Sequence, residues 1–437
     1  MNLSIIGLGK LGLPIALCVA AKGFKVIGID KDKKRVALIQ ENKLVLYEKE
    51  FLDFLKRAQG NFTVSTDIKA AIKASDMTFI IVPTPSKSDG SFALDIVLEV
   101  CRKIGEVLRD KTSFHLVVIN STVMPGHTDV IKDTLEKLSG KTCGRDFGLC
   151  YNPEFVALGN VIPGFLNPDF VLIGESDPKS GEILGSFYKQ VCKNDPPVLC
   201  TNFINAEIAK LSLNAYITTK ISFANMLAHI CEKLPGADVD VVTNILGHDH
   251  RINPFYFKAG LGYAGPCFPR DNKALMHFTD KIGVRASISA ATEEMNSLHL
   301  KEIIKKIKAV LSPQGKVCIL GLSYKPDTDV IEGSQSIEII KQLLKDGVSV
   351  IAYDPQAMDN AKQVLPEVNF ASSVEEGIDK AEVIVLAVPW VKFNQINGNV
   401  LKGKTVIDCW RLWKERLSKD KNVSYVSLGR GEEGSIC

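Results

Sequence analysis

A cysteine lies in a glycine-rich stretch at residues 260–271, past the middle of the chain. Cys267 follows three glycines and is itself followed by Arg270 and Asp271. Glycine lets the backbone approach a ligand closely, and a neighbouring cation favours the thiolate, which is the nucleophilic form of cysteine. A lone cysteine is more often a small core residue. Taken alone, the segment allows either a catalytic nucleophile or a buried thiol.

The first thirty residues have the pattern of a dinucleotide-binding unit. An apolar strand is predicted at 2–6, followed by Gly-Leu-Gly-Lys-Leu-Gly at 7–12, a helical pattern at 14–20, and a second strand at 25–29 that ends at Asp30. In this motif the first glycine makes a tight turn, the second admits a pyrophosphate, and the third packs helix on strand. The helix N-terminus then faces the phosphates.

This pattern predicts the cofactor and its contacts. Asp30 would accept hydrogen bonds from an adenosine ribose and repel a 2′-phosphate, which favours NAD over NADP. Arg35 either lies over the adenine ribose or is a solvated helix charge. The turn residues expected to bind NAD are Gly7, Gly9, Lys10, Leu11 and Gly12.

Polar side chains also follow three later predicted strands. They are Thr84 after 77–82, Thr122 after 115–119 and Glu154 after 149–151. Ligands of open α/β sheets bind beyond the carboxyl ends of the strands. From the pattern alone, the threonines either contact a ligand or cap the next helix. Glu154 is likewise either a capping residue or a catalytic carboxylate.

Two longer stretches are predicted to be helical. Residues 36–75 are amphipathic with one break, and residues 205–234 contain no proline or glycine and are followed by Pro235 and Gly236. On the second helix Glu207, Lys210 and Asn214 fall on one face. Such a polar stripe is most often solvated. A helix of this length commonly bridges domains or packs against a partner subunit.

After residue 315 the strand pattern of the first domain returns. The strands expected there are 316–321, 348–354, 381–389 and 404–408. The glycine motif does not return, because Gly-Leu-Ser-Tyr-Lys occupies 321–325, and a lysine in place of the glycines suits a different nucleotide. The fold class is therefore α/β, with two doubly wound Rossmann-like domains joined by a central helical domain that contains a long helix. The predicted domains are 1–200, 201–300 and 301–437.

Bulk properties limit the possible partners. The 437 residues suggest two or three domains, and 46% hydrophobic with 24% charged residues is ordinary for a globular protein. A net charge of +3 does not favour nucleic acid, and no apolar run reaches the roughly 18 residues of a membrane span. Eleven cysteines without a Cys-x-x-Cys pair, and no signal peptide, indicate a cytoplasmic protein. The pair His248 and His250 has no further ligands nearby, so no metal is expected.

These motifs together resemble the UDP-glucose/GDP-mannose dehydrogenase family over nearly the whole chain. The segments that carry the resemblance are 7–14, 82–85, 121–126, 152–155, Glu207-x-x-Lys210-Leu211-x-x-Asn214, 262–271 and 321–325. Such enzymes oxidise the C6 alcohol of a nucleotide-linked hexose to a carboxylate and reduce two NAD. The resemblance implies an NAD-dependent nucleotide-sugar 6-dehydrogenase, with UDP-glucose to UDP-glucuronate as the first expectation.

The resemblance also implies catalytic roles. Cys267 would attack the aldehyde to give a thiohemiacetal and later a thioester, and Glu154 would assist the water that hydrolyses the thioester. Lys210 and Asp271 would stabilise oxyanions or hold that water, and Asn214 would position the sugar. Each assignment resolves an alternative that the pattern had left open.

Further contacts follow from the same resemblance. The NAD contacts it implies are Thr84, Thr122, Glu154 and Arg270. The substrate contacts are Lys210, Asn214, Tyr256, Lys258, Tyr263, Gly265 and Lys325, with Arg251 reaching the sugar of the neighbouring subunit. The expected domains are thus an NAD-binding, a central dimerisation and a nucleotide-sugar-binding domain. The expected assembly is a homodimer or a higher homo-oligomer.

Five positions depart from the family pattern, and one of them is Arg270, which stands where a lysine is expected. Ala157 and Leu158 stand where a second acid is common, Glu332 replaces an arginine, and Trp410 stands where an arginine is expected, with Arg411 displaced by one. These departures keep other readings open. They are a UDP-N-acetylhexosamine or GDP-mannose 6-dehydrogenase and a degenerate nucleotide-sugar-binding protein without catalysis. The three-part layout separately allows a two-electron 3-hydroxyacid dehydrogenase, which needs no cysteine.

Overall fold

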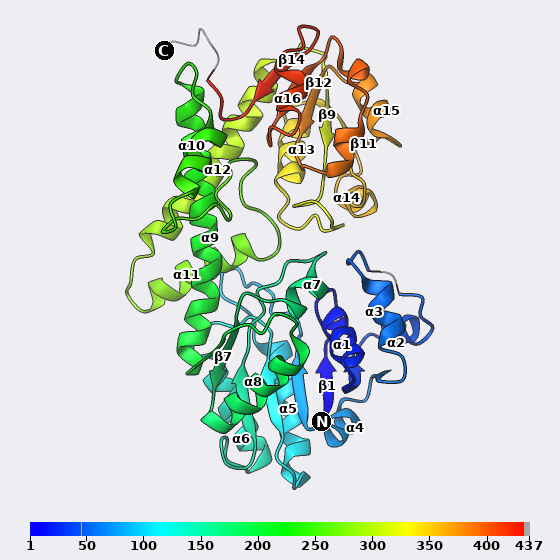
Figure 1. Ribbon diagram of the computed structural model, residues 1–437, viewed down its shortest axis with the longest axis vertical. Coiled ribbons are helices and arrows are strands. Elements are labelled where there is room, and N and C mark those ends of the chain that lie inside the picture. Colours follow the sequence, from blue (N-terminus) through cyan, green and yellow to red (C-terminus); the bar gives the residue numbers. More distant parts are fainter. Residues whose placement is uncertain (45, 432–437) are drawn as a thin grey trace. The chain divides into compact units, whose positions relative to one another are not determined.

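The computed structural model describes residues 1–44 and 46–431, and its chain divides into two compact units. The units are Met1–Ser212 and Leu213–Cys437, and the boundary between them lies within the long helix α9 (Phe203–Glu232). Each unit holds one open, mainly parallel sheet (Figure 1). The expected α/β class with two Rossmann-like domains and a central helical region is therefore confirmed, while the three domain boundaries stay a prediction.

The first unit is built on an eight-stranded sheet in the order β3-β2-β1-β4-β5-β6-β7-β8. Neighbouring strands are parallel except β6 and β7, which are antiparallel. The first six positions have the strand order of a dinucleotide-binding fold. The strands are β1 (Asn2–Ile6), β2 (Lys25–Ile29), β3 (Phe62–Ser65), β4 (Met77–Ile80), β5 (Leu116–Ile119), β6 (Gly148–Tyr151), β7 (Val171–Glu175) and β8 (Val198–Thr201).

Helices cover both faces of this sheet. Alternate strand residues face opposite ways, so Leu116 and Val118 pack with α1, α3, α7 and α8, whereas Val117 and Ile119 pack with α4, α5 and α6. Burial on both faces explains why the strands are almost wholly apolar. The helices are α1 (Gly12–Ala21), α2 (Lys33–Gln40), α3 (Phe51–Arg57), α4 (Ile68–Ala74), α5 (Asp95–Asp110), α6 (His127–Ser139), α7 (Val161–Leu166) and α8 (Pro178–Val191).

One predicted helical stretch is wrong in part. Residues 36–75 contain the later part of α2 and all of α3 and α4, but they also contain strand β3, which pairs with β2 at the edge of the sheet. The segment Phe62–Ser65 is aromatic and β-branched, and its pairing with β2 outweighs the helical spacing of its neighbours.

The second unit repeats the strand order in a six-stranded parallel sheet, β11-β10-β9-β12-β13-β14. The strands are β9 (Lys316–Leu320), β10 (Ser349–Tyr353), β11 (Asn369–Phe370), β12 (Val383–Leu386), β13 (Thr405–Asp408) and β14 (Ser424–Ser427). The helices around it are α13 (Gln335–Lys345), α14 (Met358–Val364), α15 (Val374–Asp379) and α16 (Lys414–Leu417), with 3-10 helices η1 (Val391–Gln395) and η2 (Gly398–Leu401). The four strands expected after residue 315 are all present.

Helices precede this second sheet in the chain. They are α10 (Val239–Gly247), α11 (Phe268–Lys281) and α12 (Ser287–Ala309), which follow α9. Helix α9 is the long helix expected at 205–234. Among the described residues, no helix combines the length and the apolar character needed to cross a bilayer.

Candidate active site

The glycine turn after β1 leaves room for a ligand where the motif requires it. Gly7 has φ +99°, and a Cβ there would lie 2.2 Å from the carbonyl oxygen of Ile81. A Cβ on Gly12 would lie 1.9 Å from the Gly7 oxygen, so the start of α1 packs directly on the turn. By contrast, a Cβ on Gly9 would meet nothing within 4 Å. The open position is the one that a pyrophosphate approaches, beside the N-terminus of α1.

Asp30 is held in place at the end of β2. Its carboxylate accepts hydrogen bonds from the backbone N–H groups of Leu8 at 3.0 Å and Asp32 at 2.9 Å. The guanidinium of Arg35 lies 3.2 Å from Asp30 Oδ2 and is 40% exposed, so this arginine is an ion-pair partner of Asp30. Lys10 is exposed and Leu11 half-buried in the turn itself.

The two predicted threonines lie together beyond β4 and β5. The Thr84 hydroxyl donates to the backbone oxygen of Thr122 at 2.7 Å, and Ser121 accepts from the Val82 N–H at 3.0 Å. Both loops thus meet at the carboxyl edge of the sheet. The alternative of helix capping does not apply to Thr84, because its hydroxyl is used between the loops.

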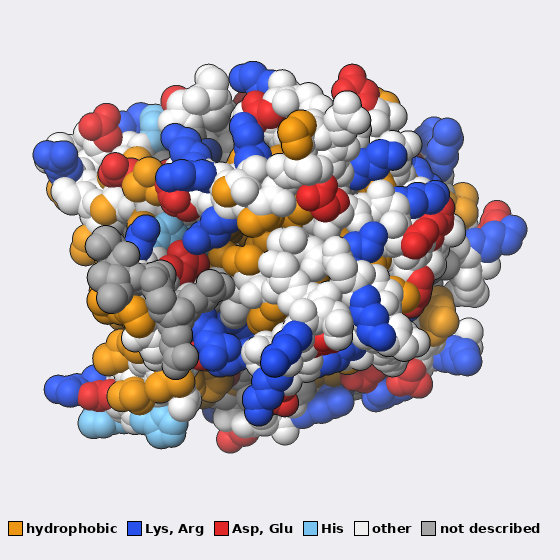
Figure 2. Space-filling view, turned by 90° about the horizontal axis from the view of Figure 1, so that it is seen from above, with side chains coloured by type: hydrophobic (Ala, Val, Ile, Leu, Met, Phe, Trp, Pro, Cys, Tyr) orange, Lys and Arg blue, Asp and Glu red, His pale blue; other side chains and the backbone are white. Residues whose placement is uncertain are grey.

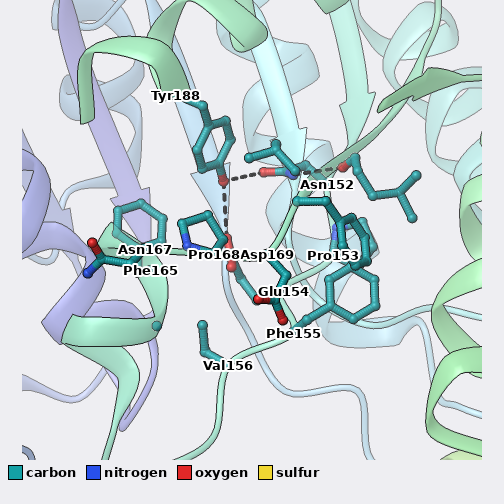
Figure 3. A pocket seen from close by; sticks show the side chains of 14 residues that line it. Asn152, Pro153, Glu154, Phe155, Val156, Phe165, Asn167, Pro168, Asp169 and Tyr188 are labelled. Carbon is teal, nitrogen blue, oxygen red and sulfur yellow. Dashed lines mark hydrogen bonds between the residues drawn. The ribbon is translucent and has the colours of Figure 1, made fainter. Parts of the chain in front are cut away.

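Glu154 is half-buried and joins a cluster of buried polar side chains just beyond β5 and β6 (Figure 3). Its Oε1 lies 3.3 Å from Asn120 Nδ2 and 3.1 Å from the hydroxyl of Tyr188, and that hydroxyl also lies 2.5 Å from Asn152 Oδ1. Burial raises the pKa of Glu154 to about 7, against the lowering effects of the Tyr188 hydrogen bond and the charge of Lys210. A carboxyl that titrates near neutrality suits a general base.

Lys210 reaches the same cluster from α9. Its ammonium donates to the backbone oxygen of Glu154 at 2.6 Å and lies 4.6 Å from the centre of the Phe155 ring. Glu207, one turn earlier, accepts from the backbone N–H groups of Gly126 at 2.6 Å and Thr128 at 2.8 Å. It therefore caps the N-terminus of α6.

The polar stripe of α9 is accordingly not solvated. Glu207, Lys210 and Asn214 are 0%, 6% and 7% exposed. Burial of the stripe is the physical reason that each side chain has a specific polar partner, because an unpaired buried charge is costly. The interpretation of the stripe as a solvated face is thus wrong.

In the second unit, Cys267 stands at the N-cap position of α11 and is exposed. The partial positive charge of a helix N-terminus lies beside its sulfur, which favours an anionic sulfur or an oxyanion formed there. Most other described cysteines are buried, and burial raises the thiol pKa, for example to about 12 at Cys101 and Cys318. The alternative that Cys267 is a core thiol is therefore excluded.

Charged and amide groups surround the start of α11. Asp271 is fully buried and accepts a hydrogen bond from Asn214 Nδ2 at 2.6 Å. Its other oxygen pairs with the guanidinium of Arg270 at 3.0 Å. Arg270 and Asp271 lie within four residues of Cys267 in the chain, and Asn214 contacts Asp271 from helix α9. The structure thus brings together three residues that the sequence suggests separately.

Three side chains hold the backbone of the cysteine-bearing stretch. Asn225 Oδ1 accepts from the Gly260 N–H at 3.0 Å, and His299 Nε2 lies 2.6 Å from the Gly260 oxygen. Burial lowers the pKa of His299 to about 4, so the neutral ring donates this bond. Arg411 Nη2 donates to the Ala259 oxygen at 2.5 Å. No pattern in the sequence pointed to Asn225 or His299.

The remaining predicted substrate residues have different surroundings. Tyr263 is buried, and its hydroxyl donates to Glu293 at 2.6 Å. Gly265 has φ +86° and lies against the Tyr324 ring, which a Cβ would approach to 2.5 Å. Tyr256 is exposed and meets the edge of the Phe268 ring, with the ring centres 6.1 Å apart.

Lys258 and Arg251 lie in the exposed loop before the glycines. The Arg251 side chain is 78% exposed and pairs with Asp249 at 2.5 Å. Asp249 stands between His248 and His250, and among the described residues no group of three or more possible ligands could hold a metal ion.

A cavity of about 170 Å³ lies beside the turn after β9. Its lining includes Tyr324, Lys325 and Trp410. The indole of Trp410 packs against Gly260 and donates to the Ala387 oxygen at 2.8 Å. This pocket places Lys325 where the strand order expects a ligand, at the carboxyl end of a strand.

The displaced Arg411 does not restore the arginine missing at Trp410. Its side chain is 1% exposed, and its Nε pairs with Asp240 at 2.7 Å. A shift of one residue therefore puts an indole at the pocket and a guanidinium into the packing against α10. Glu332, the other departure in this unit, is exposed.

The turn after β9 has the same backbone shape as the turn after β1, but the carboxylate at its end is fully occupied by hydrogen bonds from the protein. Gly321 has φ +99°, as Gly7 has, and Asp354 stands at the position of Asp30. Asp354 is 1% exposed and accepts six hydrogen bonds, including one from Trp390 Nε1 at 3.2 Å. Its carboxylate has no capacity left for a ribose, so the second turn is not a second NAD site of the first kind.

The surface drawn in Figure 2 carries mixed charges. Lysine and arginine side chains alternate there with acidic and uncharged ones.

Comparison with known proteins places the chain in a family. Models of the UDP-glucose/GDP-mannose dehydrogenase family match it with the NAD binding domain at residues 1–192, the central domain at 204–298 and the UDP binding domain at 318–415. The chain belongs to the UDP-glucose/GDP-mannose dehydrogenase family. It is thus a nucleotide-sugar 6-dehydrogenase, and its cofactor is NAD.

Relatives of this dehydrogenase cover nearly the whole chain. A UDP-glucose 6-dehydrogenase of Haloferax volcanii is 33% identical over 98% of this chain and 100% of its own length. A GDP-mannose 6-dehydrogenase of Pseudomonas putida is 33% identical over 93% and 95%. The structure of a UDP-glucose dehydrogenase from Pyrobaculum islandicum matches with a TM-score of 0.90 at 31% identity, covering 98% of both chains.

Proposed function

We propose that this dehydrogenase oxidises the C6 alcohol of a nucleotide-linked hexose to the acid in two steps, with UDP-glucose to UDP-glucuronate as the leading reaction. The observation that carries the proposal is the exposed thiol of Cys267 at the N-terminus of α11, beside the linked pair Asn214 and Asp271. A two-electron alcohol dehydrogenase needs no such thiol.

The residues would act in sequence. The Cys267 thiol adds across the C=O bond of the aldehyde formed in the first oxidation, with its sulfur on carbon and its proton on oxygen, giving a thiohemiacetal. Loss of a hydride from that carbon and of the proton from its hydroxyl then gives a thioester. Water then attacks the thioester, the carbon–sulfur bond breaks, and Glu154 takes the proton of the water. Lys210 and Asp271 stabilise the oxyanions or hold the water, and Asn214 positions the sugar. NAD, when bound, accepts the hydride that leaves C6 in each oxidation.

Different observations support binding of the cofactor and binding of the substrate. The open position at Gly9 and the anchored Asp30 support binding of NAD in the first unit. The cavity with Lys325 and Trp410 supports binding of the nucleotide in the second unit. One relative is named a UDP-glucose 6-dehydrogenase and another a GDP-mannose 6-dehydrogenase. The choice of UDP as the nucleotide and of glucose as the sugar is therefore part of our proposal.

The remaining contacts of the proposal follow the family resemblance. NAD would also contact Thr84, Thr122 and Arg270. The sugar would contact residues of the glycine-rich stretch and the loop before it. They are Tyr256, Lys258, Tyr263 and Gly265.

We also propose a homodimer that acts in the cytoplasm. Helices α9 and α10 carry large apolar side chains that are strongly exposed, among them Tyr216 at 67% and Ile245 at 65%. A second copy would cover such side chains. None of the ten described cysteines is joined to another in a disulfide, which fits a reducing compartment.

NADH yield tests the function. The purified protein is incubated with NAD and with UDP-glucose, UDP-N-acetylhexosamines or GDP-mannose in separate reactions. Two NADH per sugar acid are expected. One NADH per sugar would indicate a two-electron dehydrogenase, and tight sugar binding without NADH would indicate a degenerate binding protein.

A further inference from the structure

We propose that Tyr188 is a positioning residue for Glu154, and that it turns its single hydroxyl proton between Asn152 and Glu154 as Glu154 gains and loses a proton. This inference rests on the proposed role of Glu154 as the base for thioester hydrolysis. Tyr188 lies on α8, in the core of the first unit, and the motifs of the sequence do not include it.

The geometry gives the Tyr188 hydroxyl two acceptors. Asn152 Oδ1 lies at 2.5 Å and Glu154 Oε1 at 3.1 Å from its oxygen (Figure 3). The Asn152 side chain is fixed, because its Nδ2 donates to the Leu172 oxygen at 2.8 Å. The Tyr188 ring is fixed too, since it meets the rings of Phe165 and Phe187 at centre distances of 5.9 and 5.2 Å.

One proton cannot serve two acceptors at once, so the cluster has two arrangements. When Glu154 is ionised, the Tyr188 hydroxyl donates to Oε1. When Glu154 is protonated on Oε1, its proton is donated to the Tyr188 oxygen, and the Tyr188 proton turns to Asn152. Each arrangement keeps the same heavy-atom contacts. Oε1 stays held in both, so the carboxyl group keeps its orientation through a catalytic cycle.

Tyr188 acts here as a neutral hydroxyl. Burial, together with the charge of Glu154, raises the pKa of Tyr188 well above its usual value, so it does not ionise. Asn120 Nδ2 donates to Glu154 Oε1 at 3.3 Å, and the other groups that face Glu154 are the ammonium of Lys210 from α9, Asp169 in the wall of a cavity that Glu154 also lines, and the Cys192 thiol after α8. Only the Tyr188 hydroxyl donates to Glu154 and can also accept from it.

The test is the substitution Tyr188→Phe, which keeps the ring and removes the hydroxyl. Infrared titration of the full-length protein follows the C=O band of protonated Glu154, identified by its loss in Glu154→Gln. A hydrogen bond to an ionised group is stronger than one to a neutral group. The midpoint for Glu154 should therefore rise by roughly one pH unit in Tyr188→Phe. The acid limb of the pH profile of kcat should move by the same amount.

Two further variants separate positioning from packing. Tyr353→Phe removes the hydroxyl of a tyrosine on β10 that accepts a hydrogen bond from Lys392. This control should leave the titration midpoint of Glu154 unchanged. Placing 3-fluorotyrosine at position 188 keeps ring and hydroxyl but makes the hydroxyl a better donor. The midpoint should then fall, opposite to the effect of phenylalanine, and this variant serves if Tyr188→Phe does not fold.

The proposal is overturned if the Glu154 midpoint is the same in the wild type and both position-188 variants. It is also overturned if Tyr353→Phe moves the midpoint as much as Tyr188→Phe. Because the infrared titration needs no substrate, it decides on Tyr188 even if no nucleotide sugar is oxidised. In that case the proposed function fails and the inference about Tyr188 is judged separately.

Discussion

Asn214 Nδ2 donates to Asp271 Oδ2 at 2.6 Å and so ties the middle of α9 to the first turn of α11, directly after Cys267. Both residues are buried, and Asp271 has Arg270 as a second partner. A change on α9 should therefore be felt at the cysteine through Asp271.

The first prediction concerns this bond. Asn214→Ala removes a donor from a buried carboxylate, which should lower the free energy of unfolding by about 1–3 kcal/mol and also lower kcat. Chemical denaturation measures the first quantity. The matched control Asn205→Ala, at an exposed position of the same helix, should change stability by less than about 0.5 kcal/mol. In a double-mutant cycle with Asp271→Asn, strictly additive effects would contradict a direct coupling.

The second prediction concerns pH and stability. The folded pKa of Glu154 is raised from 4.5 to about 7, so between these values the folded protein binds the proton more readily than the unfolded chain. This group therefore costs stability increasingly as pH rises through that window. Glu154→Gln removes the cost. Its Tm relative to the wild type should rise from pH 5 to pH 8, as measured by differential scanning calorimetry. A difference in Tm that is constant with pH would contradict the raised pKa.

The third prediction concerns cofactor choice. The wild type should prefer NAD to NADP, because the Asp30 carboxylate would repel a 2′-phosphate. Asp30→Asn keeps the shape and removes the charge, which also releases Arg35 to meet a phosphate. The ratio of kcat/KM with NADP to that with NAD should rise about tenfold, a difference of about 1.4 kcal/mol. Equal kcat/KM with NAD and NADP in the wild type would show that Asp30 does not contact the ribose.

The fourth prediction concerns the covalent step. Cys267→Ala should abolish acid formation, and Glu154→Gln should accumulate the thioester because hydrolysis lacks its base. Mass spectrometry of Glu154→Gln with substrate and NAD should find the adduct on the peptide that contains Cys267. Cys200→Ala is the matched control, since Cys200 is the other exposed thiol among the described cysteines. Four-electron turnover by Cys267→Ala would disprove the mechanism.

The fifth prediction concerns a shared active site. Arg251 lies in an exposed loop and pairs with Asp249, so within its own chain it has a local partner. If it instead reaches the sugar of the partner subunit, Arg251→Ala and Cys267→Ala should each be inactive or badly impaired alone. Mixed dimers of the two should regain part of the activity, because one site combines an intact cysteine with an intact arginine. Mixed dimers with no more activity than the single variants would show that Arg251 does not act across an interface.

Much of this architecture could be predicted because strongly apolar strands and glycine turns are local signals. The β1 turn, the strands after residue 315 and helix α9 all fall where the sequence places them. Strand β3 was missed because its four residues lie between amphipathic helices, and only pairing with β2 makes them a strand.

The candidate site could be predicted from the sequence where a reactive residue lies in a recognisable motif. Cys267 and Glu154 each follow such a signal. Tyr188 and His299 do not, because an aromatic side chain in an amphipathic helix has the spacing of any core residue. Their partners, Glu154 and the Gly260 backbone, are distant in the chain and are brought near only by tertiary packing.

The two matching turns differ in how far protein engineering could alter them. Asp30 accepts from two backbone N–H groups and also pairs with a half-exposed arginine, so asparagine, which keeps an acceptor oxygen, can change the charge of this recognition surface. Asp354 accepts hydrogen bonds from six donors in three segments of the chain. An apolar replacement would leave these buried donors without an acceptor, which lowers stability. Redesign of cofactor preference can therefore start at the first turn, whereas the second turn tolerates little change and is better treated as a fixed scaffold.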